Sequence, residues 1–344
     1  MSAVLPGPEI DGYQLPDVLF RRPLVACPWC SSESIAFRVR LSDTRQCKPG
    51  IFHVDECRDC GHVFQNPRPT PAALAYYRRD CYDGVGRENY ASMAARSGRA
   101  NRARLRHLAG LPRPRRWLEV GARQGHLCRD IRPLLPGTEI WAVEPSTEIL
   151  LAADRGWLDV PVRDPLTELA GTHPGWFDVV SMVNYLERTE DPRAELAAAR
   201  RLLRPGGAIL LETVNPESAF ARLYGNYWFG WLAPQNLNLI PWRNLCRTLA
   251  ENGFELRDMA LGAANKPFDN VAALMTALNY HLPPARRWPW SGIEVPAARK
   301  AFRHAVVAAA APLAVLAVLV DQLLHAVTVR GRGGNAYRVA AVRT

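Results

Sequence analysis

The feature that most constrains the fold is a regular alternation of short apolar runs and helical patterns between residues 117 and 213. A helical pattern from Arg193 to Leu203 separates two of these runs and is stopped by Pro205-Gly206-Gly207. The alternation predicts an α/β fold with a doubly wound, mostly parallel sheet that binds ligands at the C-terminal ends of its strands. The expected strands are Trp117–Val120, Glu139–Glu144, Phe177–Val183 and Ala208–Thr213.

The rest of the chain divides by composition. We expect an irregular arm over residues 1–20, a small β-rich module over 21–75 and a helical linker over 76–110. The α/β domain would occupy 111–344. Within it we expect an aromatic- and proline-rich insertion at 219–300, an apolar helix at 301–327 and a closing strand from Asn335 to Val342.

Two CxxC pairs lie in the module over 21–75, Cys27 with Cys30 and Cys57 with Cys60. Each CxxC turn directs two thiolates at one point, and two such turns complete the tetrahedral all-thiolate site that zinc prefers. Residues 1–16 lack the basic and apolar regions of a secretory signal, so we expect a reducing, cytoplasmic compartment, where metal ligation prevails over disulfides. The pattern therefore predicts a zinc-ribbon module whose Zn²⁺ is structural, because no coordination position stays open for catalysis. A redox pair is the alternative.

A glycine-containing turn follows the first expected strand directly and precedes a helix. Gly121 and Gly125 permit a tight turn and a close approach of the backbone to a ligand. Glu144 ends the next strand about 20 residues further on, where its carboxylate can accept hydrogen bonds from a ribose diol. Turn, spacing and acid together predict a nucleotide-type cofactor, but they do not separate a nicotinamide cofactor from S-adenosylmethionine.

Several segments resemble the class I S-adenosylmethionine-dependent methyltransferases. Leu118-Glu-Val-Gly-Ala-Arg-Gln-Gly125 resembles motif I of that family, and Phe177-Asp-Val-Val…Leu-Glu-Arg-Thr-Glu-Asp-Pro192 resembles its fourth-strand motif. Arg201-Leu-Leu-Arg-Pro-Gly-Gly207 is similar to the turn before strand five. The stretch from Cys60 to Pro69 and the pair Tyr76-Tyr77 resemble segments that precede this domain in bacterial small-molecule and deoxysugar methyltransferases. The resemblance implies a Rossmann-like sheet and S-adenosylmethionine as cofactor.

The resemblance also assigns cofactor-binding residues, among which it includes Glu119 of motif I. It implies that Glu144 binds the ribose and that Gly121 and Gly125 line the amino-acid part of the cofactor. It places Asp164 opposite the adenine amine. A solvated strand-end acid is the alternative for Glu144, and a loop-capping acid is the alternative for Asp164.

Three residues depart from the family pattern. Arg123 replaces the middle glycine of motif I, and Arg188 replaces the histidine of the Leu-Glu-His sequence. Gln235-Asn236 stands where sugar C-methyltransferases place a Glu-His pair, and an amide cannot act as a general base. An enzyme that transfers a methyl group to an oxygen or nitrogen atom could tolerate these changes, because positioning of the nucleophile supplies much of the rate. The candidates for substrate contact, each with packing or loop bonding as its alternative, are Tyr82, Asn184, Tyr185, Asn215 and Asn236.

The leading hypothesis is therefore methyl transfer to a small-molecule acceptor such as a sugar, a cell-envelope precursor or a secondary-metabolite precursor. A decayed methyltransferase fold that serves as a binding or scaffold protein is the alternative, and an RNA methyltransferase comes third. The net charge of +10 would suit an anionic partner. The arginines are spread along the chain rather than clustered, which argues against nucleic acid as that partner.

The expected helix at 301–327 has no charged or strongly polar residue from Ala305 to Val320. These sixteen residues fall short of the roughly 20 that a bilayer span requires. One interpretation is a helix buried on the sheet or in a dimer contact. The other is a peripheral membrane contact through 286–325, assisted by Trp288 and Trp290 beside basic residues. The sequence indicates no oligomeric state.

Overall fold

The computed structural model describes residues 17–79, 98–262, 268–284, 296–328 and 333–344. Contacts divide the chain into two units. The first comprises Met1–Arg87, Ala219–Leu237 and Lys266–Thr328, and the second comprises Glu88–Ser218, Asn238–Asn265 and Val329–Thr344. Residues of the expected insertion at 219–300 thus fall in both units, and the domain boundaries stated above stay a prediction.

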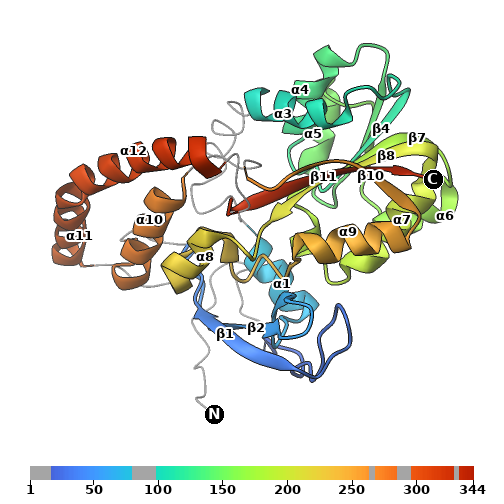
Figure 1. The fold of residues 1–344 in the computed structure, drawn as a ribbon. Coiled ribbons are helices and arrows are strands. Elements are labelled where there is room, and N and C mark those ends of the chain that lie inside the picture. Colours follow the sequence, from blue (N-terminus) through green and yellow to red (C-terminus); the bar gives the residue numbers. More distant parts are fainter. Residues whose placement is uncertain (1–16, 80–97, 263–267, 285–295, 329–332) are drawn as a thin grey trace. The chain divides into compact units, whose positions relative to one another are not determined.

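The second unit is built on a seven-stranded sheet of order β10-β11-β8-β7-β4-β5-β6. The five strands from β8 to β6 are parallel, and β11 is antiparallel to both of its neighbours (Figure 1). The predicted α/β class, the mostly parallel sheet and each predicted strand are confirmed. The bounds are β4 Arg116–Val120, β5 Glu139–Val143, β6 Val160–Val162, β7 Phe177–Val183, β8 Leu203–Val214, β10 Phe254–Ala260 and β11 Ala336–Arg343, with a short strand β9 at Asn238–Leu239.

Helices connect these strands and cover the sheet. In α7 (Pro192–Leu202), Asp191 accepts a hydrogen bond from the Ala194 N–H, and Pro192 occupies the first turn, where its missing N–H costs nothing. The core lies between the sheet and its helices, where Trp117, Ile131 and Ile140 are fully buried. The other helices of this unit are α3 Gly98–Leu105, α4 His126–Ile131, α5 Glu148–Asp154, α6 Leu166–Thr172 and α9 Trp242–Glu251, with 3-10 turns η1 Arg106–Leu108, η2 Arg132–Leu134 and η3 Leu186–Arg188.

The first unit contains an antiparallel sheet in which β2 (Phe52–Cys57) pairs with β1 (Ile35–Leu41) and with β3 (Val63–Gln65). Helix α1 (Pro71–Arg78) follows, and the buried Lys48 caps its C-terminal end. Lys48 Nζ donates to the carbonyl oxygens of Tyr76 and Arg79 at 2.6 Å each, as a cation near a helix C-terminus should. The remaining elements are α8 Ala219–Tyr224, η4 Gly225–Tyr227, η5 Phe229–Trp231, α10 Asp269–His281, α11 Ala297–Ala309 and α12 Ala311–Thr328.

The prediction of a single apolar helix at 301–327 is wrong, because the structure has two helices there, α11 and α12. They meet at Ala310 with a bend of 45°. Pro312 lies at the second position of α12, and a proline there cannot donate the hydrogen bond that would continue α11. Burial of this segment within the chain is not observed, since α11 contains no buried residue and α12 is exposed over most of its described length; burial in a dimer contact stays a prediction.

Candidate functional site

The order of the parallel strands reverses beside β4, because β5 and β6 continue on one side and β7 and β8 on the other. Ligands of open α/β sheets bind at such a switch point, outside the carboxyl ends of the strands. The loops that follow β4, β5 and β7 at this edge contain the predicted residues Gly121, Glu144, Asn184 and Tyr185. The structure therefore brings these four to one edge of the sheet.

The turn after β4 requires glycine at position 121. Gly121 has φ +73°, and its N–H donates to the Val143 carbonyl oxygen at 2.9 Å. A Cβ on Gly121 would lie 2.5 Å from Cδ2 of Tyr185, closer than side-chain carbons approach one another. The Tyr185 ring thus covers this glycine, and its hydroxyl donates a hydrogen bond to Glu195 of α7.

Gly125 serves the packing of two helices. It has φ +71° at the N-cap of α4, and a Cβ there would lie 2.6 Å from the Cβ of Ala152 in α5. Glycine at this position lets the start of α4 approach α5 closely. Its predicted role beside the cofactor stays a prediction.

Glu144 holds the loops after β4 and β5 together. Its Oε2 accepts from the Arg123 backbone N–H at 2.9 Å, and its Oε1 accepts from the Ser146 N–H at 3.2 Å. A carboxylate offers about four acceptor positions, so two remain for further donors. The side chain is half-buried rather than fully solvated.

Asn184 carries a polar atom that the described part of the chain leaves unsatisfied. Its φ is +51°, and its backbone N–H donates to the Glu212 carbonyl oxygen at 2.8 Å. The side-chain Oδ1 is buried and has no hydrogen-bond partner among the described residues. A buried acceptor without a partner costs free energy, so this atom marks a position where a ligand donor would be stabilising.

Glu119 is buried within the sheet. Ser181 Oγ donates to its carboxyl, and Trp117 Nε1 donates to Ser181 Oγ at 2.7 Å. Burial raises the pKa of Glu119 to about 8, against the opposing effects of Ser181 and Arg104. At neutral pH this carboxyl is thus mainly protonated. Its described hydrogen-bond partner is the protein's own Ser181, and its predicted contact with the cofactor stays a prediction.

Next to Glu119 the structure holds a buried ion cluster that sequence reasoning missed. Glu212 accepts from Arg104 Nε and Nη2 at 2.8 and 2.5 Å and from Arg338 Nε and Nη2 at 2.9 and 2.5 Å. The two guanidinium groups lower the pKa of Glu212 despite its burial. Charged residues inside the apolar strands β8 and β11 were the available signal, since Glu212 and Arg338 face each other in the register of these strands.

Arg123 stands in the turn with φ +50°. Its charge lowers the pKa of the buried Glu187, which burial nevertheless raises to about 7. The Arg123 charge is therefore close enough to Glu187, in the 3-10 turn after β7, to stabilise its ionised form. Glu187 also accepts from Thr213 Oγ1 at 2.8 Å.

The remaining candidates lie in different surroundings. Asp164 is exposed in the loop before α6. Asn215 is buried, with Nδ2 donating to the Gly334 carbonyl oxygen at 2.9 Å and Oδ1 accepting from the Glu217 N–H at 3.0 Å, which ties the loop after β8 to the start of β11. Asn236 belongs to the first unit, where its Nδ2 donates to the Gly230 carbonyl oxygen at 3.0 Å. Tyr82 lies outside the described residues.

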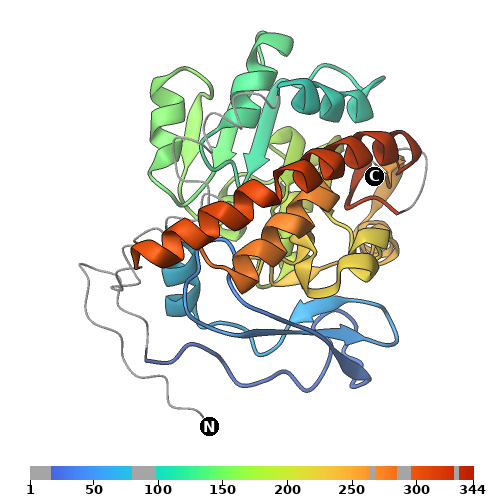
Figure 2. The same ribbon diagram turned by 90° about the vertical axis from the view of Figure 1, so that its left-hand side faces the viewer.

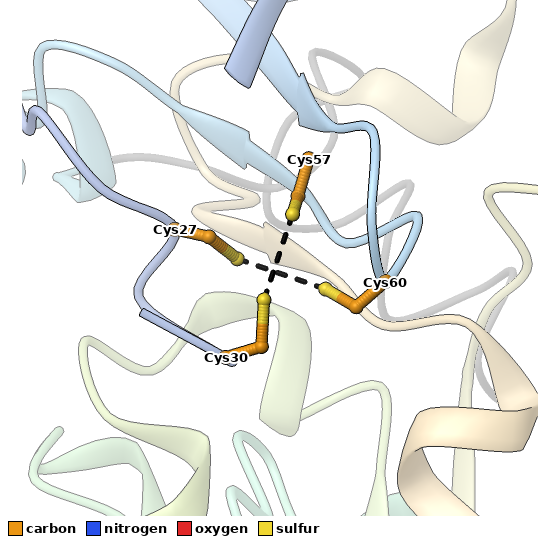
Figure 3. A group of neighbouring side chains, drawn as sticks. All are labelled: Cys27, Cys30, Cys57 and Cys60. Carbon is orange, nitrogen blue, oxygen red and sulfur yellow. Dashed lines mark hydrogen bonds between the residues drawn. The ribbon is translucent and has the colours of Figure 1, made fainter. Parts of the chain in front are cut away.

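In the first unit the four cysteines converge on one point (Figure 3). Cys27 Sγ lies 3.7 Å from Cys60 Sγ, and Cys30 Sγ lies 3.5 Å from Cys57 Sγ. All four sulfur atoms lie within 4.8 Å of one another. A zinc tetrahedron with Zn–S distances of about 2.3 Å has edges of about 3.8 Å, so the donor set matches this ion in type and in spacing.

Comparisons with known proteins agree with the predicted fold and family. A family model described as a methyltransferase domain matches residues 92–258. The ubiquinone biosynthesis O-methyltransferase of Xanthomonas euvesicatoria pv. vesicatoria is 30% identical over 178 residues, which cover 48% of this chain and 73% of that protein. The enzyme of the same name from Xanthomonas axonopodis pv. citri is 29% identical over 195 residues, covering 52% and 80%.

Solved structures of similar fold include the 1,6-didemethyltoxoflavin-N1-methyltransferase of Burkholderia thailandensis with bound S-adenosylhomocysteine. It is 17% identical, with a TM-score of 0.40 over 83% of this chain and 97% of that chain.

Proposed function

We propose that this chain, which belongs to the class I S-adenosylmethionine-dependent methyltransferases, transfers a methyl group to an oxygen or nitrogen atom of a small-molecule acceptor. The observation that carries the proposal is the meeting of Gly121, Glu144 and Asn184 at the switch point of the sheet. The similar Xanthomonas proteins are named as O-methyltransferases of ubiquinone biosynthesis, which supports a small-molecule acceptor.

The residues at the switch point fit the cofactor. When bound, S-adenosylmethionine supplies a methyl group on a sulfonium, which is electrophilic without further activation. Glu144 has two acceptor positions left for the ribose hydroxyls, and Asn184 Oδ1 is a buried acceptor suited to the amino group of the methionine part. The Tyr185 ring would border the same space, since it covers Gly121.

The acceptor type is proposed from a departure in the sequence, since amides at positions 235 and 236 replace the Glu-His pair of sugar C-methyltransferases. Gln235 Nε2 donates to the Tyr77 carbonyl oxygen at 2.9 Å, and Asn236 Nδ2 donates to the Gly230 carbonyl oxygen. Neither amide can remove a carbon-bound proton near neutral pH. Hydroxyl, phenol or amine acceptors need less help of this kind, because a correctly positioned lone pair attacks the methyl group directly.

We also propose that Cys27, Cys30, Cys57 and Cys60 hold one structural Zn²⁺. Four thiolates fill the coordination of the ion, so it would stabilise the β1–β3 module without taking part in methyl transfer.

Isothermal titration with S-adenosylhomocysteine tests the cofactor site. Wild-type protein should bind, and Glu144→Gln should weaken binding by about tenfold or more, because one charged hydrogen bond contributes about 1.5–3 kcal/mol. Glu168→Gln, an exposed change in α6, is the matched control and should bind as the wild type does. A millimolar Kd corresponds to a binding free energy of only about 4 kcal/mol. If the folded wild-type protein does not bind at about millimolar ligand, the proposal is wrong and the scaffold alternative is favoured.

A further inference from the structure

The helices α11 and α12 form the most apolar segment of the first unit. From Ala305 to Val320 the chain contains only alanine, valine, leucine and one proline. In Figure 2 the two helices run as one long bent rod beside α10, and contacts between α10 and α12 agree with this view. The segment is therefore attached to the unit along one side.

Most of this apolar surface is exposed. Of the 21 exposed large hydrophobic side chains in the described part of the chain, nine lie between Phe302 and Leu324. The less exposed positions follow a helical spacing, at Val306, Ala310, Ala314, Ala317 and Asp321, which makes one narrow stripe. Monomeric soluble proteins rarely leave so large a contiguous apolar patch uncovered, so this surface requires a partner. The nine side chains are Phe302, Val307, Leu313, Val315, Leu316, Val318, Leu319, Leu323 and Leu324.

The acidic and basic residues of the segment differ in exposure. Its one acid, Asp321, is buried and accepts hydrogen bonds from the N–H groups of Asn270 and Val271 at the start of α10. Arg299 and Lys300 are exposed in the first turn of α11. The outer surface of the segment is thus aliphatic and basic, which is the combination that binds an anionic bilayer surface.

The topology of the sheet excludes a single crossing of the membrane by this segment. Neither helix alone is long and apolar enough to cross a bilayer, although the bent pair together meets that criterion. The strand before the segment, β10, and the strand after it, β11, pair with each other in one sheet. One crossing would place these two strands on opposite sides of the membrane, so the helices can only lie in the interface or dip into it and return.

We propose that α11 and α12 form an in-plane anchor that inserts the aliphatic side chains of α12 into an anionic lipid bilayer. A second copy of this surface is a poorer occupant for two reasons. Exposed side chains such as Leu313, Val318 and Leu319 lie on different sides of α12, whereas a packed helix covers only one stripe. A second copy also offers no exposed acid from this segment to Arg299 and Lys300. The proposal does not depend on the acceptor proposed above.

Vesicle sedimentation tests the anchor with the full-length zinc-loaded protein. Wild-type protein should sediment with vesicles of phosphatidylcholine and phosphatidylglycerol and bind phosphatidylcholine vesicles more weakly. The double variant Leu316→Glu, Leu319→Glu should weaken binding by about tenfold or more, because burial of one leucine contributes about 1.5–3 kcal/mol. Both side chains are more than half exposed, so the folded protein and its affinity for S-adenosylhomocysteine should be unchanged. Arg299→Glu with Lys300→Glu should reduce binding to the anionic vesicles alone.

Leu223→Glu in α8 is the matched control, since Leu223 is also an exposed leucine and lies outside the segment. It should bind vesicles as the wild type does. An equal loss of binding in this control would overturn the proposal, as would wild-type protein that ignores both kinds of vesicle. A wild-type dimer that the Leu316→Glu, Leu319→Glu variant converts to monomer, without vesicle binding, would assign the surface to a second copy instead.

Discussion

Replacing Gly121 by alanine should destabilise the second unit for two separable reasons. At φ +73° an alanine lies in the left-handed region, which costs about 1–2 kcal/mol. Its Cβ would also lie 2.5 Å from Cδ2 of Tyr185. The ring cannot move freely, because its hydroxyl is bound to Glu195, and such overpacking costs about 1–3 kcal/mol. The expected loss in the free energy of unfolding is therefore about 2–5 kcal/mol.

Gly137→Ala isolates the first contribution. Gly137 has φ +81°, and a Cβ there meets no atom within 4 Å, so only the backbone cost of about 1–2 kcal/mol should appear. Urea unfolding followed by circular dichroism measures both variants. In the Tyr185→Ala background, Gly121→Ala should cost only about as much as Gly137→Ala does, because the ring that the new Cβ meets is gone. Equal losses for Gly121→Ala and Gly137→Ala would refute the contact between Tyr185 and the turn.

Two further predictions concern the cysteines and the buried acid. Metal analysis should find about one zinc per chain. The variant Cys57→Ser should lose this zinc, whereas Cys246→Ser, outside the cluster, should keep it. Stoichiometric zinc in Cys57→Ser would contradict the four-cysteine assignment. Glu119 has a folded-state pKa of about 8 against an ordinary value of 4.5, so between these pH values the folded protein holds a proton that the unfolded chain releases. The free energy of unfolding should thus fall as pH rises through this window, by at most about 1.4 kcal/mol for each pH unit, and Glu119→Gln should flatten that fall. The same slope in both proteins, measured by urea unfolding at pH 5 and pH 8, would show that Glu119 is not the group responsible.

Local patterns in the sequence predicted much of the fold and the edge where the site lies. The strand from Phe177 to Val183 has the predicted bounds, and α7 begins and ends within one residue of the prediction. Such elements are predictable because apolar periodicity, caps and proline–glycine turns involve residues close together in the chain. The turn at Gly121 and the two CxxC pairs are local signals of the same kind.

The surroundings of the site residues were not predictable in this way. Glu119 lies one residue before the end of its strand pattern and Glu144 lies at the end of the next, but Glu119 is buried beside Ser181 and Glu144 is half-buried in the loop after β5. Which face an acid takes depends on the strands that pair beside it. The predicted link between Asn236 and the cofactor residues stays untested, since Asn236 belongs to the other unit.

The sequence by itself determined the order of strands and helices, the glycine turn after β4 and the cysteine quartet, because each depends on neighbouring residues. The tertiary structure alone decided that Glu212 is held by Arg104 and Arg338, residues more than 100 positions away in each direction. The tertiary structure also decided that α12 is exposed, because an apolar run has the same pattern in a core helix and in an exposed helix. Only the elements packed around such a run, here α10 along one stripe, determine which of the two it becomes.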